Sequence, residues 1–337
     1  MKNYKVIVVG ATGAVGREMI ATLEKREFPV GELKLLASQR SEGKLIDFNG
    51  GKIAVEVLNK DSFKNYDIAL FSAGGATSKE FAPYAKAAGV YVIDNSSAWR
   101  MEQDIPLVVP EVNPDALKKD SYIIANPNCS TIQMVQVLKP LHDYAKIKRV
   151  VVSTYQAVSG AGKKGIDDLS SQIKEIENGE KVVCKQFQYQ IAYNVIPQID
   201  VFLENGYTKE EMKMILETQK IMEDELIKVT ATTVRVPVYR GHAESINIET
   251  EKELSPEKAR ELLSDFKGII VEDDLKNSKY PMPIFAENKY ETFVGRIRKD
   301  ETVKHGLNMW VVSDNLLKGA ASNAVQIAEE LINQKII

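Results

Sequence analysis

The segment Ile124–Ile132, IANPNCSTI, contains Cys129, one of two cysteines in the 337-residue chain. Pro127 disfavours a helical conformation of the residue before it, and apolar residues recur at helical spacing after Cys129, so a helix is predicted to begin close to the cysteine. The partial positive charge of a helix N-terminus stabilises a thiolate, and its N–H groups can stabilise an oxyanion. Cys129 is therefore a candidate nucleophile, although cysteine is more often a buried, unreactive residue.

The other cysteine, Cys184 in the segment KVVCK, lacks this context and is expected to be the buried, unreactive kind. Two cysteines could form one disulfide, but in a reducing compartment both are expected to remain thiols.

A nucleophilic cysteine needs a proton acceptor, and the chain has three histidines. His142 lies on the helix predicted to begin at Cys129, roughly 20 Å further along it, so it cannot be the partner. His242 follows the strand-like run Thr232–Val238, in a loop suited to a functional site. His305 lies in a polar loop without accompanying reactive residues, so His242 is the preferred acid or base.

A glycine-rich turn, Gly10–Gly16, joins the first predicted strand to a helix predicted over residues 14–26. Backbone N–H groups and the helix dipole at such a turn can hold a pyrophosphate. The spacing GxxGxxG is looser than the common dinucleotide fingerprint, and a tight structural turn is the alternative interpretation. The residues expected to contact a dinucleotide here are Gly10, Thr12, Gly13, Ala14 and Val15.

The end of the second predicted strand should lie near the adenosine ribose, where a basic residue accommodates the extra phosphate of NADP. No carboxylate precedes Glu42 there, so NADP is favoured over NAD, with contacts expected from Ser38, Arg40 and Ser41. A solvated loop charge is the alternative for Arg40. A second turn, Ser72–Thr77, follows another strand, and Gly74 and Thr77 are expected to flank the cofactor unless the turn is purely structural.

The first half of the chain alternates predicted strands with predicted helices. This pattern indicates a doubly wound, mostly parallel α/β domain. The strands are expected at Lys5–Gly10, Leu33–Ala37, Lys52–Leu58, Asp67–Phe71, Val90–Ile93, Leu107–Val109 and Tyr122–Ala125, with a second helix at Ser78–Ala88.

The second half indicates an α+β lobe with long strands and long helices. Strands are expected at Arg149–Gln156 and Thr230–Tyr239, and helices at Lys163–Asn178, Thr208–Leu226 and Leu316–Asn333. The segment Thr208–Glu211 has the pattern of a helix-capping box. Because no repeat or linker separates the halves, the site is expected between them.

Composition excludes several classes of protein. The net charge of −3 comes from 44 basic and 47 acidic residues that are interspersed, so a nucleic-acid-binding surface is not expected. No apolar run approaches the roughly 20 residues that span a bilayer, and the N-terminus runs directly into a strand. A cytoplasmic protein without a metal site or a membrane anchor is therefore expected.

Taken together and in order, the motifs resemble those of aspartate-β-semialdehyde dehydrogenases. The resemblance covers essentially the whole chain and is carried by GATGAVG (10–16), SAGG (72–75), NSSAWR (95–100), NPNCST (126–131), QAVSG (156–160), EEMK (210–213) and RVPV (235–238) followed by Gly241 and His242. It implies a Rossmann-like NADP-binding domain over residues 1–127 and 316–337. Residues 128–315 would form a central α+β domain for catalysis and for assembly into a homodimer or a dimer of dimers.

The resemblance also implies a reaction. Cys129 would attack L-aspartyl 4-phosphate, phosphate would leave, and NADPH would reduce the resulting thioester to L-aspartate 4-semialdehyde, a step in lysine, threonine and methionine biosynthesis. His242 would be the general acid/base, and Gln156 would orient the substrate. The other implied contacts are Arg235, Glu210 and Asn128 with the substrate, Arg100 and Lys213 with phosphate, and Ser159, Gly160 and Asn315 with the cofactor.

Residue chemistry supports several of these assignments. The planar fork of Arg235 matches a carboxylate, with Arg240 in the following turn as its rival. Glu210 and Lys213 are three residues apart and can share one helix face, although an ordinary surface ion pair has the same spacing. Arg100 follows a strand end, where α/β sheets usually hold ligands.

Two alternatives remain open at this stage. N-acetyl-γ-glutamyl-phosphate reductase shares the fold and the Cys/His chemistry, but its nucleophile motif usually resembles NPGCY rather than NPNCS, and its substrate would give Glu210 no ammonium group to pair with. A catalytically silent, dinucleotide-binding regulatory relative should have lost its nucleophile, base or carboxylate anchor. Cys129, His242 and Arg235 are all present, which disfavours that alternative.

Overall fold

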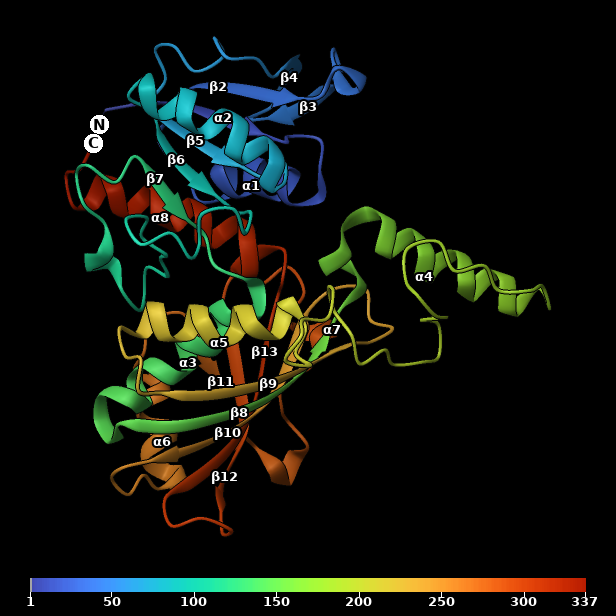
Figure 1. Cartoon of the computed structure of the whole chain (residues 1–337), viewed down its shortest axis with the longest axis vertical. Coiled ribbons are helices and arrows are strands. Elements are labelled where there is room, and N and C mark those ends of the chain that lie inside the picture. Colours follow the sequence, from blue (N-terminus) through green and yellow to red (C-terminus); the bar gives the residue numbers. More distant parts are fainter. Residues whose placement is uncertain (1) are drawn as a thin grey trace. The chain divides into compact units, whose positions relative to one another are not determined.

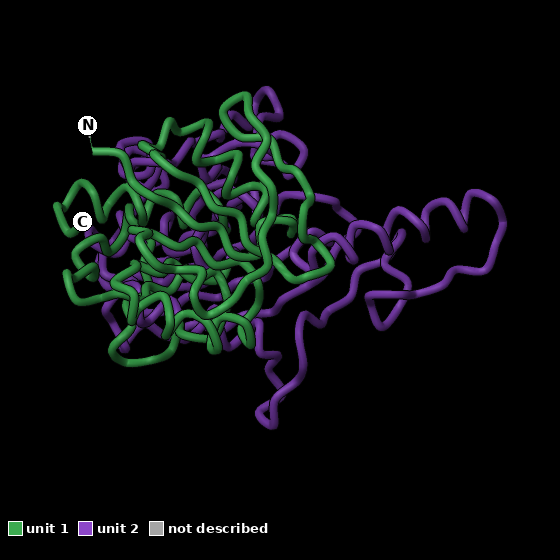
Figure 2. The backbone as a smooth tube through the Cα atoms, turned by 90° about the horizontal axis from the view of Figure 1, so that it is seen from above, with its two compact units in different colours: residues 1–128, 320–337 green, residues 129–319 purple. Residues whose placement is uncertain are grey.

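The computed structural model describes residues 2–337 and divides into two compact units. Unit 1 comprises residues 1–128 and 320–337, and unit 2 comprises residues 129–319 (Figure 2). A π-helical turn, Leu317–Ala321, carries the chain from unit 2 back into unit 1. Two stretches distant in sequence therefore build the first unit.

Unit 1 is built on a seven-stranded sheet in the order β3-β4-β2-β1-β5-β6-β7, in which every neighbouring pair is parallel except β3 with β4. Its strands are β1 (Tyr4–Val9), β2 (Val30–Ala37), β3 (Leu45–Phe48), β4 (Gly51–Val57), β5 (Ile68–Phe71), β6 (Tyr91–Asp94) and β7 (Ile123–Ala125), and its helices are α1 (Ala14–Lys25), α2 (Gly75–Ala87) and α8 (Ser322–Asn333).

Both faces of this sheet are covered, which explains the continuous apolar runs of its strands. Because side chains alternate along a strand, Val6 and Val8 of β1 pack into a core that includes residues of α1 and α8, whereas Ile7 and Val9 pack into the core that includes α2. The predicted doubly wound α/β domain is thereby confirmed.

Unit 2 is built on a six-stranded mixed sheet in the order β11-β12-β13-β10-β8-β9. Its strands are β8 (Ile147–Gln156), β9 (Lys228–Arg235), β10 (His242–Thr250), β11 (Ile269–Val271), β12 (Thr292–Asp300) and β13 (Gly306–Ser313). Its helices are α3 (Cys129–Ala145), α4 (Gly162–Glu177), α5 (Lys209–Met222), α6 (Pro256–Ser264) and α7 (Pro283–Ala286), and α4 extends away from the sheet with the loop that follows it (Figure 1). This is the predicted α+β lobe.

Several predicted elements differ from the structure. Leu107–Val109 is not a strand and forms only a bridge between Leu107 and Ala125, because prolines on both sides remove hydrogen-bond donors. Helix α5 ends at Met222 rather than Leu226, since Glu223 adopts a left-handed conformation with φ of 52°. Strand β9 ends at Arg235, two residues before a proline.

The cysteine that was expected to be buried is exposed. Cys184 lies in the irregular segment after α4, where charged neighbours keep it at the surface, so the prediction of a packed residue was wrong. Neither cysteine of the described chain forms a disulfide. Among residues 2–337, no helix is long and apolar enough to cross a membrane.

Candidate functional site

A cleft of about 500 Å³ lies in unit 1, at the carboxyl ends of β1, β2 and β5. This is the edge at which parallel α/β sheets bind ligands. Five of the residues predicted to bind a dinucleotide line it: Gly10, Thr12, Gly13, Ser38 and Thr77. Gln39 and Phe81, which sequence analysis did not single out, also line the cleft.

The glycine turn presents the N-terminus of α1 to this cleft. Gly10 has a φ of 84°, and a Cβ there would lie 2.5 Å from the carbonyl oxygen of Ser72, so only glycine fits. Gly13 is the N-cap residue of α1, and within the described residues no side-chain hydrogen bond caps this end of the helix. Ala14 and Val15 form the first turn of α1, whose N–H groups are therefore suited to an anion such as pyrophosphate.

The residues after β2 form a short 3₁₀ turn, Gln39–Ser41. The buried Ser41 hydroxyl lies 3.2 Å from the Thr12 hydroxyl, which ties this turn to the glycine turn. Arg40 is exposed and does not line the cleft itself. On the other side of the cleft, Gly74 caps the N-terminus of α2 with a φ of 85°, one turn before Thr77.

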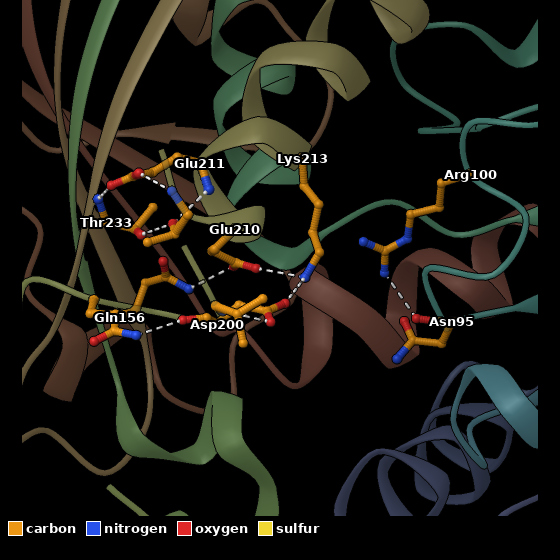
Figure 3. Close-up of polar contacts among 11 residues, drawn as sticks. Asn95, Arg100, Gln156, Asp200, Glu210, Glu211, Lys213 and Thr233 are labelled. Atoms are coloured by element: carbon orange, nitrogen blue, oxygen red, sulfur yellow. Dashed lines mark hydrogen bonds and ion pairs between the residues drawn. The ribbon is translucent and has the colours of Figure 1, made fainter. Parts of the chain in front are cut away.

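Arg100 is a buried arginine on the segment that follows β6 in unit 1. Its Nη2 atom donates to the carbonyl oxygen of Asn95 over 2.9 Å (Figure 3). The Asn95 side chain in turn accepts from Asn126 Nδ2 at 2.7 Å, and Asn128 is buried two residues further on. The structure thus holds Arg100 at the carboxyl edge of the sheet, close to the segment that leads to Cys129.

In unit 2, Cys129 is the first residue of α3 and is half-buried. A Cβ on Gly319 would lie 2.7 Å from the Cβ of Cys129, so the π turn packs closely against the start of α3. The Arg235 guanidinium interacts electrostatically with Cys129. Helix dipole and guanidinium both favour the thiolate form. His142, far along α3, instead accepts from the backbone of Ile147 at 3.1 Å.

His242 opens β10 and is fully buried. Its Nδ1 atom accepts a hydrogen bond from the Ala157 N–H at 3.0 Å, so the neutral ring carries its proton on Nε2. Burial, followed by the charge of Arg235, lowers the pKa of His242 to about 3, although Glu210 opposes the shift. The ring is therefore neutral at physiological pH in the ligand-free chain.

Arg235 ends β9 and is also buried. Its Nη1 atom donates to the carbonyl oxygen of Ala157 at 2.7 Å, and its guanidinium lies 5.9 Å from the centre of the Phe187 ring. Burial lowers the pKa of Arg235, while Glu210 and Cys129 oppose that shift. Gly160 lies close to both Arg235 and His242, because a Cβ there would be 2.8 Å from Arg235 Nη1 and 3.3 Å from His242 Nε2.

Gly160→Ala is therefore expected to lower kcat/KM by roughly tenfold or more, because the added methyl displaces the Arg235 side chain and crowds the His242 ring. Steady-state kinetics beside thermal unfolding measure this effect. Gly51→Ala is the matched control, since Gly51 is not in a left-handed conformation and a Cβ there would meet only the Phe48 carbonyl oxygen, at 3.6 Å. Full activity of the Gly160 variant would show that this space is not used by substrate or cofactor.

Gln156, Glu210 and Lys213 form one continuous polar chain (Figure 3). Gln156 Nε2 donates to Glu210 Oε1 at 3.1 Å, and Lys213 Nζ lies 3.1 Å from Glu210 Oε2 and 3.1 Å from Asp200 Oδ2. Burial alone would lower the pKa of Lys213, but Glu210 and Asp200 outweigh it and raise the pKa. Glu210 is buried, so the pair is more enclosed than an ordinary surface ion pair.

Helix α5 presents these two charges because its start is well defined. Thr208 and Glu211 form the predicted capping box, with both reciprocal hydrogen bonds present. Glu211 also accepts from the backbone of Thr233 on β9 at 2.9 Å (Figure 3). The first turn of α5 is thereby fastened to the strand that carries Arg235.

Ser159 and Asn315 are joined directly: Asn315 Nδ2 donates to the Ser159 hydroxyl at 3.0 Å. Asn315 Oδ1 accepts from the Gly241 N–H at 2.9 Å. Sequence analysis missed the residue before it, Asp314, which is fully buried and paired with Arg240. The one feature of the sequence that pointed to Asp314 was its position beside Asn315, which was already predicted to contact the cofactor.

Comparison with known proteins gives consistent matches. Residues 5–120 match the family model described as semialdehyde dehydrogenase, NAD binding domain, and residues 138–318 match semialdehyde dehydrogenase, dimerisation domain. The chain is 62% identical to the aspartate-semialdehyde dehydrogenase of Aquifex aeolicus (strain VF5), over 99% of this chain and 100% of that protein.

Solved structures agree with these matches. The crystal structure of aspartate semialdehyde dehydrogenase II complexed with ASA from Vibrio cholerae is similar with a TM-score of 0.97 and 50% identity, covering 99% of each chain. The aspartate semialdehyde dehydrogenase with NADP from Candida albicans has a TM-score of 0.78 and 27% identity, covering 100% of both chains.

Proposed function

The chain belongs to the aspartate-semialdehyde dehydrogenase family, and we propose that it carries out the family's reaction with NADPH and with Cys129 as the nucleophile. It is an oxidoreductase of amino-acid biosynthesis with a nicotinamide dinucleotide-binding domain. The reaction is the reversible reductive dephosphorylation of L-aspartyl 4-phosphate to L-aspartate 4-semialdehyde. One observation carries the assignment of the nucleophile: Cys129 stands at the N-terminus of α3 and in the electrostatic field of Arg235.

In the proposed first step, the Cys129 thiolate attacks the acyl carbon. The new carbon–sulfur bond forms as the bond to the phosphate oxygen breaks, and phosphate leaves with the electron pair. The N–H groups at the start of α3 are suited to stabilise the oxyanion that develops. The product is a thioester on Cys129.

The second step reduces this thioester. When bound, the reduced nicotinamide supplies the hydride. His242 donates a hydrogen bond from Nε2 to the reacting oxygen, on which negative charge develops as the hydride adds, because Nδ1 is engaged by Ala157 and the ring is neutral. Collapse of the thiohemiacetal then releases the semialdehyde and restores the thiolate, and the opposite sequence of steps runs the reaction in reverse.

The substrate contacts follow from charge and geometry. Arg235 would hold the α-carboxylate with its planar fork, and Glu210 would pair with the α-ammonium group. Gln156 donates to Glu210 and accepts from the Thr154 hydroxyl, so its amide is held in one orientation beside the substrate. Asn128, a buried residue directly before Cys129 in the sequence, would contact the acyl group.

Two cations, Arg100 and Lys213, are proposed to receive the phosphate. Arg100 offers a buried guanidinium held by Asn95. Lys213 stays protonated because neighbouring carboxylates raise its pKa. Anion binding by both would neutralise the leaving group as the bond to the acyl carbon breaks.

The residues of the cleft in unit 1 fit a dinucleotide, because the α1 N-terminus lacks a side-chain cap and glycine allows close approach of a pyrophosphate. Ser38, Arg40 and Ser41 would contact the 2′-phosphate, while Ser159, Gly160 and Asn315 would lie beside the nicotinamide. Gly74 and Thr77 would line the opposite wall. These contacts favour NADP over NAD.

Arg40→Ala is expected to weaken NADPH binding roughly tenfold or more while leaving NADH binding nearly unchanged, because only NADPH carries the 2′-phosphate. Fluorescence titration of both cofactors measures this difference. Arg17→Ala is the matched comparison: Arg17 lies at the glycine turn, with Nε 3.4 Å from the Thr12 carbonyl oxygen, so its loss should affect both cofactors equally. Equal losses for the two cofactors in the Arg40 variant would remove Arg40 from the phosphate site.

A phosphate-dependent assay with L-aspartate 4-semialdehyde and NADP tests the proposed function. We expect NADPH formation to require inorganic phosphate or arsenate and to be far slower with N-acetylglutamate semialdehyde, whose acetylated nitrogen cannot pair with Glu210. Activity on the acetylated substrate alone would favour the reductase of N-acetyl-γ-glutamyl phosphate. Absence of turnover with tight cofactor binding would favour a silent dinucleotide-binding relative.

The match of residues 138–318 to a dimerisation domain supports the proposal that the chain forms a homodimer. A dimer of dimers is the alternative assembly that we propose to test. Light scattering across a concentration series measures both states.

A further inference from the structure

An ion pair between Arg240 and Asp314 lies beside the residues proposed for catalysis. Arg240 is in the turn between β9 and β10, two residues before His242, and Asp314 directly follows β13. Arg240 Nε lies 2.6 Å from Asp314 Oδ2, and the Asp314 side chain is 0% exposed. This engagement argues against Arg240 as the anchor of the substrate carboxylate.

Asp314 accepts four hydrogen bonds in fixed directions. Oδ2 accepts from the Asn288 N–H at 2.7 Å as well as from Arg240, and Oδ1 accepts from the N–H groups of Leu316 at 2.9 Å and Leu317 at 3.1 Å. The two carboxylate oxygens therefore connect different segments of the chain. One joins the β9–β10 turn to the segment before β12, and the other caps the start of the π turn.

The turn held by Oδ2 leads to the histidine. Gly241, which follows Arg240, donates to Asn315 Oδ1 at 2.9 Å, and Asn315 also bonds Ser159. His242 then pairs with Ser313, the residue before Asp314. Arg240, Gly241 and His242 therefore each contact Asp314 or a residue next to it, and these contacts fix the backbone that carries the imidazole.

The turn capped by Oδ1 leads to the nucleophile. Gly319 donates its N–H to the Asp314 carbonyl oxygen at 3.1 Å, and its Cα faces Cys129 so closely that a Cβ would lie 2.7 Å from the Cys129 Cβ. Ser313 donates to Gln133 Oε1 at 2.5 Å, one helical turn after Cys129 on α3. The segment Ser313–Gly319 therefore contacts both the histidine strand and the cysteine helix.

We propose that Asp314 is a positioning residue that sets His242 and Cys129 relative to each other, acting through Arg240 on one side and through the π turn on the other. The inference rests on the proposed function, since it takes these two side chains as the reacting groups. A buried ion pair is a weak source of stability, because desolvation offsets the Coulomb attraction. Its four directed bonds instead restrict geometry, and a displacement of about 1 Å in an active site can cost on the order of 100-fold in rate.

The test compares Asp314→Asn and Arg240→Ala with the double variant. Asparagine can keep an acceptor for the Leu316 and Leu317 N–H groups, but it loses the charge that pairs with Arg240 and the second acceptor that meets the Asn288 N–H. Each single variant is expected to lower kcat roughly 10- to 100-fold with KM for aspartate semialdehyde within about twofold, and the double variant should be no worse than the poorer single one. Arg240→Lys should recover part of kcat by restoring the positive charge.

A second ion pair in unit 2 provides the matched control. Arg260 Nε lies 2.8 Å from Asp273 Oδ2, the Asp273 side chain is 2% exposed, and its carboxylate also accepts backbone N–H groups of Arg296 and Ile297. It joins α6 to β12 and touches no residue proposed for catalysis in the described hydrogen bonds. Asp273→Asn therefore measures the general cost of breaking such a pair.

The alkylation rate of Cys129 by iodoacetamide provides a readout independent of turnover, with the exposed Cys184 as an internal reference thiol. Asp314→Asn should change the Cys129 rate and leave the Cys184 rate unchanged. An unchanged kcat and Cys129 rate, a rise in KM alone, or a loss no larger than that of Asp273→Asn would each overturn the proposal. Wild-type protein without aspartate-semialdehyde activity would instead contradict the proposed function, and the alkylation comparison would still report on Asp314.

Discussion

Cys129→Ala is expected to lower kcat by a factor on the order of 10⁴ or more while leaving NADPH binding unchanged, because no other group can form the thioester. The side chain is small and half-buried at the start of α3, so its truncation removes little packing. Stopped-flow measurement of turnover, beside titration with NADPH, separates the chemical step from cofactor binding.

Cys184→Ala is the control for this experiment, since Cys184 is exposed and lies in the irregular segment after α4. It should retain full activity. In the wild type, L-aspartyl 4-phosphate added without NADPH should release a burst of inorganic phosphate equal in amount to the Cys129 sites. Substantial steady-state turnover of the Cys129 variant would reject the covalent mechanism.

Arg235→Lys is expected to reduce kcat/KM for aspartate semialdehyde roughly 100-fold or more, because an ammonium group cannot replace the two parallel hydrogen bonds of a guanidinium. The native side chain also donates to the Ala157 carbonyl oxygen at 2.7 Å, and Ala157 in turn donates to His242. The substitution should therefore disturb both substrate binding and the orientation of the imidazole, so kcat and KM should both change.

Arg298→Lys is the control for the carboxylate anchor, because Arg298 is exposed on β12 and donates to the carbonyl oxygen of Arg296 at 2.8 Å. Its kinetics should match those of the wild type. An unchanged kcat/KM for the Arg235 variant combined with a large loss for the Arg298 variant would reassign the anchor. Competitive inhibition by simple dicarboxylates, measured for both variants, distinguishes a lost carboxylate contact from a general loss of structure.

Local patterns correctly predicted the starts of α3 and α5, and for a physical reason. The Pro-Asn segment before Cys129 and the Thr208–Glu211 capping box act within one turn of the backbone, so their effect does not depend on distant residues. The end of α5 was predicted at Leu226, whereas the helix ends at Met222. The end of α5 depends on Glu223 adopting a left-handed conformation, which no local residue type required.

The sequence by itself determined the fold class, the family, the Rossmann-like turn at Gly10–Gly16 and the identity of the charged and nucleophilic side chains, because each depends on residue type and short spacing. Only the tertiary structure decided which partners those side chains have. Arg240, a rival for the carboxylate, is paired with Asp314, and His242 is neutral with its proton on Nε2 because a backbone N–H meets Nδ1. Such pairings join residues more than 70 positions apart, and their energies depend on burial, which the linear sequence does not specify.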